Sequence, residues 1–266
     1  MVVLATGQRA RGVHAAQAPR RAVGLGEVEA VAAGAAPVRQ EPGALVGGAA
    51  VDELERPAAH ADRAEALEHA EVAAAVAPMV KAFWNYPETV HLLSSAGARR
   101  RALPRYLRAD ADDAVRFDLL LGAEVDGVIR GAAAWIPPEA YPVSAGRQLR
   151  QALQLLPALP SSWRSLPEAR RGQAANRLRH RDCPADHFYL RAIGVDPAAQ
   201  SRGLGSSLVQ PVLELADRRS AGCFLQTATI DNVSWYERFG FEIVDHYRPT
   251  STWPPVWAMW RDPTTA

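Results

Sequence analysis

The stretch 189–208 constrains the fold more than any other part of the chain. It opens with an apolar run that stops at Pro197, because proline cannot donate to a sheet ladder. A short loop with two glycines, Gly203 and Gly205, follows. Apolar residues then recur at helical spacing, at Leu204, Leu208, Val212, Leu215 and Ala216. The sequence therefore predicts a strand, a tight loop and a helix in that order.

This loop is suited to bind an anion. The first backbone N–H groups of a helix have no partner inside it, and the helix dipole favours negative charge there. Gly203 and Gly205 lack a Cβ, and Arg202 adds a cation. Leu208 stands where a dinucleotide fingerprint has its third glycine, and no Gly-Lys-Ser/Thr of a Walker loop follows. The residues alone are equally compatible with a plain glycine turn.

Two segments in sequence order resemble a known family. Residues 200–205, Gln-Ser-Arg-Gly-Leu-Gly, are similar to the Gln/Arg-x-x-Gly-x-Gly/Ala signature of the GNAT acetyltransferases. Residues 232–241 resemble that family's Asn-x-x-x-Tyr-x-x-x-Gly-Phe segment. Two shorter segments, 82–87 and 255–259, are similar to puromycin N-acetyltransferase-like members. The likeness extends roughly from residue 67 to the C-terminus.

The pattern of strands and helices predicts a mixed α/β (α+β) fold. An antiparallel hairpin turns at Asp126-Gly127, a strong turn signal. A parallel strand–helix–strand crossover follows from residue 187. The resemblance implies a GNAT-type mixed sheet with splayed central strands, flanking helices and a helical insertion between strands 3 and 4. We expect strands over 117–125, 128–135, 187–195, 223–227, 241–247 and 256–260, helices over 68–83 and 94–107, and the insertion over 139–186.

Residues 1–66 differ from the rest of the chain. They are rich in Ala, Gly, Arg and Pro and contain no Phe, Trp or Tyr, so they cannot bury enough apolar area to offset their ordering entropy. We interpret them as a disordered or non-native leader, with an organelle transit peptide as the alternative, and 67–266 as the acetyltransferase domain. The family usually opens with a strand, but 61–67 is a poor strand former. Either that strand is missing or the upstream sequence is not native coding.

Composition excludes several classes of partner. The net charge of +1 gives no reason to expect nucleic acid, and no apolar run approaches a membrane span. The two cysteines, Cys183 and Cys223, are too few for a disulfide framework or a zinc cage and predict a reducing, cytoplasmic setting. The seven histidines form no metal-binding spacing. We expect a monomer or homodimer without a metal.

The resemblance implies transfer of an acetyl group from acetyl-CoA, the co-substrate, to an amine. Backbone N–H groups of the loop would hold the pyrophosphate. A strand N–H near Ile193 would polarise the thioester carbonyl, and the strand edge would pair with pantetheine. Asn232 contacts the cofactor or caps a helix. The cofactor-binding residues so implied are Ile193, Gly194, Val195, Gln200, Ser201, Arg202, Gly203, Leu204, Gly205, Ser206, Ser207 and Asn232.

Two tyrosines carry the implied chemistry. Tyr236 matches the family's general acid, which protonates the departing thiolate; a packed aromatic is the alternative. Tyr86 is the catalytic candidate on the substrate side. The general base of the puromycin-type relatives is missing. Those relatives carry a Glu where this chain has Gln226, and a glutamine side chain cannot accept a proton at neutral pH. Water, Tyr86, Glu88 or Asp118 remain as candidate bases, or the acceptor has a low pKa.

The sequence thus predicts an N-acetyltransferase acting on a small-molecule amine, including antibiotic-like ones, with the insertion walling the acceptor pocket. Two alternatives stay open. One is acetylation of a protein amine. The other is a CoA-binding regulatory module with lost catalysis, which the Gln226 departure suggests.

Overall fold

The computed structural model describes residues 64–140, 143–181 and 186–264. The expected leader lies outside the described residues except for its last three positions, and the division at residue 66 stays a prediction.

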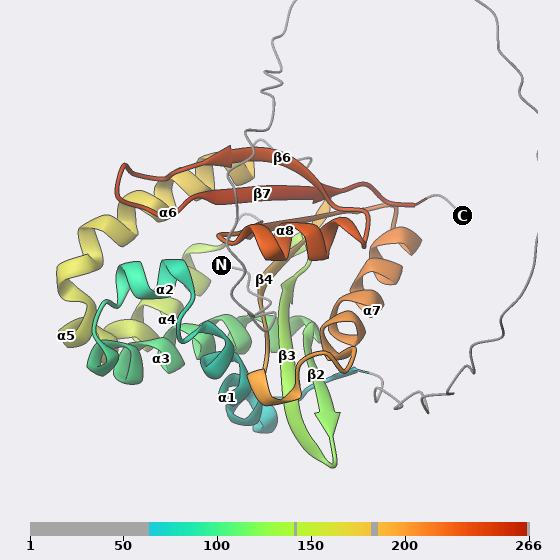
Figure 1. The fold of residues 1–266 in the computed structure, drawn as a ribbon, viewed down its shortest axis with the longest axis horizontal. Coiled ribbons are helices and arrows are strands. Elements are labelled where there is room, and N and C mark those ends of the chain that lie inside the picture. The colour runs from blue at the N-terminus through green and yellow to red at the C-terminus, as the bar shows by residue number, and fades with distance from the viewer. Residues whose placement is uncertain (1–63, 141–142, 182–185, 265–266) are drawn as a thin grey trace, which may run out of the picture. The chain divides into compact units, whose positions relative to one another are not determined.

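One mixed sheet organises the described residues (Figure 1). Its spatial order is β1-β2-β3-β4-β5-β7-β6, and every neighbouring pair is antiparallel except β4 and β5. The predicted fold class is confirmed. The strands are β1 (Glu65–Ala66), β2 (Leu120–Val125), β3 (Val128–Ile136), β4 (His187–Val195), β5 (Gly222–Thr227), β6 (Glu242–Tyr247) and β7 (Val256–Arg261).

The first strand, which the sequence left in doubt, is present over two residues. Glu65 lies opposite Gly122 and Ala66 opposite Leu121 in β2. Leu67 follows and packs where Gly122 has no side chain, since a Cβ there would lie 2.7 Å from the Leu67 methyl carbons. Pairing with β2 therefore outweighs the poor strand propensity of this segment.

Eight α-helices and six 3₁₀ turns connect the strands in the described residues. The α-helices are α1 (Val72–Phe83), α2 (Pro87–Leu92), α3 (Ala96–Ala114), α4 (Ala145–Leu155), α5 (Leu159–Ser162), α6 (Leu166–Arg181), α7 (Leu204–Arg218) and α8 (Ile230–Glu237). The 3₁₀ turns are η1 (His69–Glu71), η2 (Val115–Phe117), η3 (Pro138–Ala140), η4 (Leu156–Ala158), η5 (Trp163–Ser165) and η6 (Pro197–Ala199).

Two helical segments differ from the expectation. The helix predicted over 94–107 continues through Pro104 to Ala114, because the residues after the proline still bury an apolar face, including Leu107 and Ala111. The short helix α2 was not expected. It begins at a proline, Pro87, whose fixed φ suits the first helical position.

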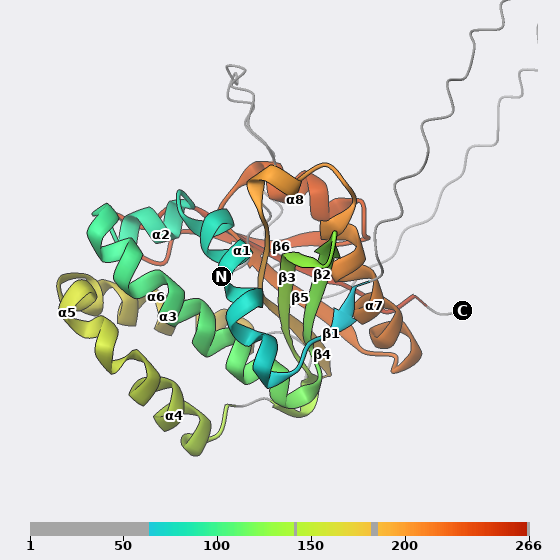
Figure 2. The ribbon, with the colours of Figure 1, turned by 90° about the horizontal axis from the view of Figure 1, so that it is seen from below.

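Helices cover both faces of the sheet. Figures 1 and 2 show α7 on one side of β2 and β3 and α1 and α3 on the other. Alternate residues of a strand pack into the cores on opposite faces of the sheet. Trp135, for example, packs in the core on the α7 side, and Ile136 packs in the core on the α1–α3 side. The alternation is broken within β4, because Leu190 and Ile193 are an odd number of residues apart and yet pack in the same core. An extra residue in the strand explains this break and shapes the site.

The insertion α4–α6 lies along α3 and reaches the loop between β6 and β7. The guanidinium of Arg147 binds the carboxylate of Asp113 through two hydrogen bonds of 3.0 and 2.6 Å. Gly172 of α6 lies against the Trp253 ring, which a Cβ would approach to 2.4 Å. The leucine stripe of α4 faces outward: the exposed fractions of Leu149, Leu153 and Leu156 are 62%, 56% and 52%.

Candidate active site

The site forms where the two parallel strands separate. β4 and β5 are paired from His187–Gly222 to Leu190–Leu225 and no further, although both strands continue. Directly after Leu190 the register between β3 and β4 shifts, which leaves Arg191 as an extra residue in β4. Such a β-bulge bends the strand that carries it. The bulge therefore accounts for the splaying expected of strands four and five.

Beyond the bulge, β4 presents a backbone edge that no described strand pairs with. The Asp196 N–H donates to the Arg130 carbonyl on β3 at 2.7 Å. Because successive residues of a strand direct their amides to opposite edges, Ile193 and Val195 direct theirs toward β5, where pairing has ended. The Val195 carbonyl accepts a hydrogen bond from the Gln200 side chain at 3.4 Å, which agrees with this orientation.

Gly194 lies between those two residues, and its lack of a side chain affects the packing of β4 against α1. Its amide turns toward β3, and a Cβ on it would lie 2.9 Å from the Met79 Cα of α1. The missing side chain therefore allows α1 to pack against the splayed half of β4.

Asp196 fixes the loop that leaves β4. Its Oδ1 accepts from the Ala198 N–H at 3.1 Å, and its Oδ2 lies 2.7 Å from Lys81 Nζ and 3.5 Å from an Arg130 nitrogen. The hydrogen bond from Lys81, more than any other contact, holds the pKa of this carboxyl below its ordinary value. The strand end, α1 and β3 are thus joined at one point.

The loop ends in two left-handed residues and a bare helix N-terminus. Ser201 has φ 65° and Gly203 has φ 82°, a conformation that is strained for serine and easy for glycine. The first helical bond runs from the Ser207 N–H to the Gly203 carbonyl at 3.1 Å. The amides of Leu204, Gly205 and Ser206 consequently have no acceptor inside α7. The structure brings the loop residues, Gln200 to Ser207, to the end of β4 as the sequence implied.

Tyr236 lies on α8, fully buried, and its hydroxyl has no hydrogen-bond partner among the described residues. Its ring packs against Trp235 and Phe241, with centroid distances of 4.9 and 5.7 Å. Burial, with a smaller effect from Tyr86, raises the pKa of Tyr236 well above its ordinary value. The hydroxyl is therefore protonated near neutral pH and free to donate.

The Tyr86 hydroxyl, unlike that of Tyr236, makes hydrogen bonds within the described residues. It accepts a hydrogen bond from the Ala228 N–H at 2.5 Å and lies 3.3 Å from Thr227 Oγ1. Asn232 Nδ2 donates to the same Thr227 oxygen at 3.0 Å. Burial, and then the charge of Glu88, raises the pKa of Tyr86. Tyr86, Asn232 and the end of β5 form one buried polar network.

Asn232 does not cap a helix. Thr229 holds the N-cap position of α8, so Asn232 is the third helical residue. That alternative interpretation of Asn232 is wrong, and the residue instead ties α8 to Thr227. Its contact with a cofactor stays a prediction.

Gln226 occupies a position lined by two phenols. Tyr189 O–H donates to Gln226 Oε1 at 3.4 Å, and Gln226 Nε2–H donates to the Tyr247 oxygen at 2.8 Å. Both ends of the buried amide are therefore used.

Two other side chains were candidates for the general base. Asp118 is exposed in the turn before β2, whereas Glu88 is buried and accepts from Trp253 Nε1–H at 3.0 Å.

Sequence reasoning did not single out Thr227, Tyr189 or Tyr247. All three lie in strands, where their pattern predicts only packing. Their role in the polar network depends on which strands become neighbours, and no local signal in the sequence contains that information.

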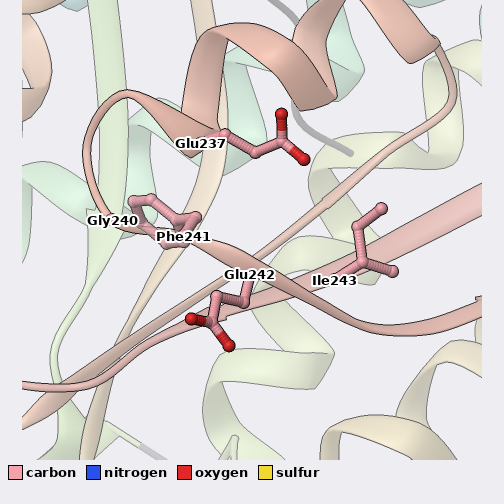
Figure 3. Close-up of a pocket in the computed structure, with 5 residues that line it drawn as sticks. All are labelled: Glu237, Gly240, Phe241, Glu242 and Ile243. Carbon is pink, nitrogen blue, oxygen red and sulfur yellow. The ribbon is translucent and has the colours of Figure 1, made fainter. Parts of the chain in front are cut away.

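A surface hollow of about 390 Å³ lies elsewhere, at the turn from α8 into β6. Figure 3 shows its lining, which consists of Glu237, Gly240, Phe241, Glu242 and Ile243. It is wide open and carries two carboxylates, which would repel the phosphates of a nucleotide. None of the sequence-predicted site residues lines this hollow.

Within residues 64–140, 143–181 and 186–264, no three His, Cys, Asp or Glu side chains are grouped so that they could hold a metal ion. In the same part of the chain no helix combines the length and apolar character needed to cross a membrane.

The fold and the loop are those of an acyl-transferring enzyme, and comparison with known proteins gives the family. Residues 92–241 match the family model described as acetyltransferase (GNAT) family, so this chain belongs to the GNAT acetyltransferases. It is therefore an acyltransferase of the class that transfers groups other than aminoacyl groups, and its family uses acetyl-CoA as co-substrate.

Solved structures share the fold at low sequence identity. A histone acetyltransferase HPA2 and related acetyltransferase from Corynebacterium glutamicum is 18% identical, with a TM-score of 0.55, over 77% of this chain and 98% of that one. Arylalkylamine N-acetyltransferase 2 from Aedes aegypti is 14% identical, with a TM-score of 0.52, over 76% and 99%. The C-terminal condensation domain of Ebony, in complex with beta-alanyl-dopamine, is 13% identical, with a TM-score of 0.53, over 75% and 97%.

Proposed function

We propose that this protein transfers the acetyl group of acetyl-CoA to the amine of a small molecule, including antibiotic-like amines. One observation carries the proposal: β4 loses its parallel partner at Leu190 and ends at a helix N-terminus with unpaired amides. An extended pantetheine needs a strand edge, and a pyrophosphate needs N–H donors. One strand and the helix after it supply both.

The cofactor would bind along this edge. The outward amides of Ile193 and Val195 pair with pantetheine, and the Ile193 N–H polarises the thioester carbonyl. The amides from Arg202 to Ser207 receive the pyrophosphate, with the dipole of α7 favouring its charge. Ser201, held at φ 65°, shapes that cradle.

Tyr236 would complete the reaction. The amine attacks the thioester carbonyl, the carbon–sulfur bond breaks, and the departing thiolate takes the proton of the Tyr236 hydroxyl. A buried donor that has no acceptor among the described residues is suited to this role, because it breaks no hydrogen bond with them when it turns to the sulfur.

The acceptor side lacks the usual carboxylate on β5. Gln226 can orient a substrate but cannot take its proton. Its two phenol neighbours, Tyr189 and Tyr247, could both donate to a carboxylate at this position, so the surroundings are compatible with the Glu of the puromycin-type relatives. The proton of the incoming amine must leave by another route.

The acceptor class rests on two likenesses. Segments 82–87 and 255–259 resemble puromycin N-acetyltransferase-like enzymes, which supports an antibiotic-like nucleoside. The Aedes aegypti structure is named for arylalkylamines, which supports a simpler amine. Acetylation of a protein amine is the alternative within the same chemistry. We place the reaction in the cytoplasm, carried out by a monomer or homodimer without a metal.

The test is a panel of amines incubated with acetyl-CoA, with free thiol release followed over time and the product identified by mass. The panel includes an arylalkylamine, a polyamine, an aminonucleoside and a peptide with a free N-terminus. Thiol release that depends on a small amine, with a product heavier by one acetyl group, supports the proposal. Release with the peptide alone would move the assignment to protein acetylation.

A second candidate, a CoA-binding regulatory module, is favoured by Gln226. Under it, acetyl-CoA would raise the melting temperature by mass action, yet no amine in the panel would release thiol. Stabilisation without turnover would therefore select the regulatory module over the enzyme.

A further inference from the structure

Glu88 is a buried carboxylate without a cationic partner among the described residues. It lies in the first turn of α2 and is 6% exposed. Among the described residues its one hydrogen-bond donor is the neutral indole N–H of Trp253, at 3.0 Å. Removing a carboxylate from water is costly unless a cation or several donors replace the water. A single neutral donor leaves most of that cost uncompensated.

The basic side chain on the same helix lies beside a different carboxylate. His91 lies one turn further along α2 and contacts the Trp253 ring, with a centroid distance of 5.0 Å. Its Nε2 lies 3.5 Å from Glu168 Oε1 on α6. In the described part of the chain no ion pair reaches Glu88, so the carboxylate faces its surroundings without a cationic partner.

Two chains of contacts place Glu88 at the acceptor side of the splayed strands. Glu88 follows Tyr86 by two residues, and the Tyr86 hydroxyl accepts a hydrogen bond from the Ala228 N–H just after β5. The indole partner of Glu88, Trp253, packs in one cluster with Tyr247, which binds Gln226. Both routes lead to the end of β5, where the relatives carry their Glu.

A second polar group of α2 is also buried without a partner. The Thr89 hydroxyl is the neighbour of Glu88 in sequence; the residue is 2% exposed, and its Oγ1 makes no hydrogen bond within the described residues. Buried polar atoms in folded proteins are nearly always satisfied. Consecutive residues of a helix do not face each other, so the Thr89 hydroxyl is a separate unsatisfied group and the proposal rests on Glu88.

We propose that the Glu88 carboxylate binds the ammonium group of the acceptor, and that this chain therefore selects amines that are protonated in solution, such as alkyl and arylalkyl amines. The proposal rests on the proposed acetyl transfer.

The test compares two probes that differ in charge. 2-Phenylethylamine is an ammonium at neutral pH, since alkyl amines have a pKa of about 10, whereas aniline is uncharged. Glu88→Gln removes the charge but keeps an oxygen that accepts from Trp253 Nε1–H. We expect KM for 2-phenylethylamine to rise about 30-fold or more, the size expected when one partner of a buried hydrogen-bonded charge pair is lost. KM for acetyl-CoA, and any activity with aniline, should not change.

Calorimetric titration of the two amines in the presence of CoA, which cannot donate an acetyl group, gives a readout independent of turnover. Weakened binding of 2-phenylethylamine to Glu88→Gln, with aniline unaffected, supports the proposal even if the chain proves catalytically silent. Equal affinity of both proteins for 2-phenylethylamine, or an equal loss for both amines, overturns it. Thiol release with no amine at all would instead remove the proposed function.

Two further variants distinguish loss of the Glu88 charge from a disturbance of the local structure. Glu88→Asp keeps the charge on a shorter side chain and should retain more affinity for 2-phenylethylamine than Glu88→Gln does. Glu168→Gln is the control for loss of a neighbouring carboxylate, because Glu168 binds Thr250 and Thr252 and contacts His91 but not Glu88 or the Trp253 indole N–H. An effect of Glu168→Gln as large as that of Glu88→Gln would refute a specific role for Glu88.

Discussion

Replacing Tyr236 with phenylalanine should change stability and turnover in opposite directions. The hydroxyl is buried and has no partner in the described residues, and such a group costs about 1–3 kcal/mol of desolvation. The ring contacts with Trp235 and Phe241 are kept in the variant. We expect Tyr236→Phe to raise the free energy of unfolding by about 1 kcal/mol, which corresponds to about 2–4 °C in Tm for a domain of this size.

Turnover should fall at the same time. Loss of one positioned acid costs roughly 10²- to 10⁴-fold in rate, or about 2.7–5.4 kcal/mol of transition-state stabilisation. The hydroxyl acts mainly as charge develops on sulfur, so KM for acetyl-CoA should remain nearly the same. Urea denaturation measures the first effect, and thiol release with a saturating amine measures the second.

Tyr86→Phe is the matched control, because it removes the same atom from a buried tyrosine. Here the hydroxyl accepts from the Ala228 N–H, so the variant leaves a buried donor unsatisfied. Its free energy of unfolding should fall by about 1–3 kcal/mol. Loss of stability in Tyr236→Phe, together with unchanged turnover, would show that the hydroxyl has a structural partner and is not the acid.

Four other perturbations test the rest of the site. Replacing Gly203 and Gly205 together with Val should abolish the stabilisation by acetyl-CoA, which would otherwise be about 2.7 kcal/mol at 100 times Kd; an unchanged shift in melting temperature would remove the cofactor from this loop. Asp196→Asn should lower the free energy of unfolding at neutral pH by about 1–2 kcal/mol. The folded-state pKa of Asp196 is lowered from 3.8. The difference in unfolding free energy between wild type and variant should therefore be fully present above the ordinary pKa and vanish as the pH falls through the folded-state pKa. Acid titrations of both proteins would detect this. Gln226→Glu should speed transfer near neutral pH, most for strongly basic amines, if deprotonation limits the rate; equal rates across a series of amine pKa values would contradict this. Deleting residues 1–60 should leave folding and acetyl-CoA binding intact, and an insoluble product from a chain that is soluble at full length would show that the segment contributes to the fold.

Local rules predicted the parts of the fold that depend on local chemistry. The turn at Asp126-Gly127 has φ 55° and 71° at its two central residues, the conformation that an Asp-Gly pair favours between antiparallel strands. Gly240 has φ 82° after α8, as expected of a glycine that ends a helix. In each case the residue type restricts its own backbone, so neighbours elsewhere in the fold are not needed for the prediction.

Other features depend on contacts between distant segments and could not be predicted in this way. The bulge at Arg191 is visible only as a shift in pairing with β3, and Asp110 of α3 binds its guanidinium at 2.8 Å. The helix α2 holds only six residues, too few to show a period. The outward stripe of α4 has the spacing of a buried face, so pattern alone could not reveal its exposure.

The two tyrosines show where sequence reasoning about the site ends. Both are aromatic residues in apolar surroundings, and both are almost wholly buried in the structure. A family motif selects Tyr236, but nothing in the sequence says that the Tyr86 hydroxyl accepts from the Ala228 N–H, or that the Tyr236 hydroxyl has no hydrogen-bond partner among the described residues. Only the pairing of strands and helices decides which phenol is satisfied. A buried donor without an acceptor can serve a reacting atom at low cost, whereas one that holds a backbone amide must first break that bond. The same change, Tyr to Phe, therefore has different consequences at the two positions, and their comparison distinguishes the catalytic role proposed for Tyr236 from the structural one at Tyr86.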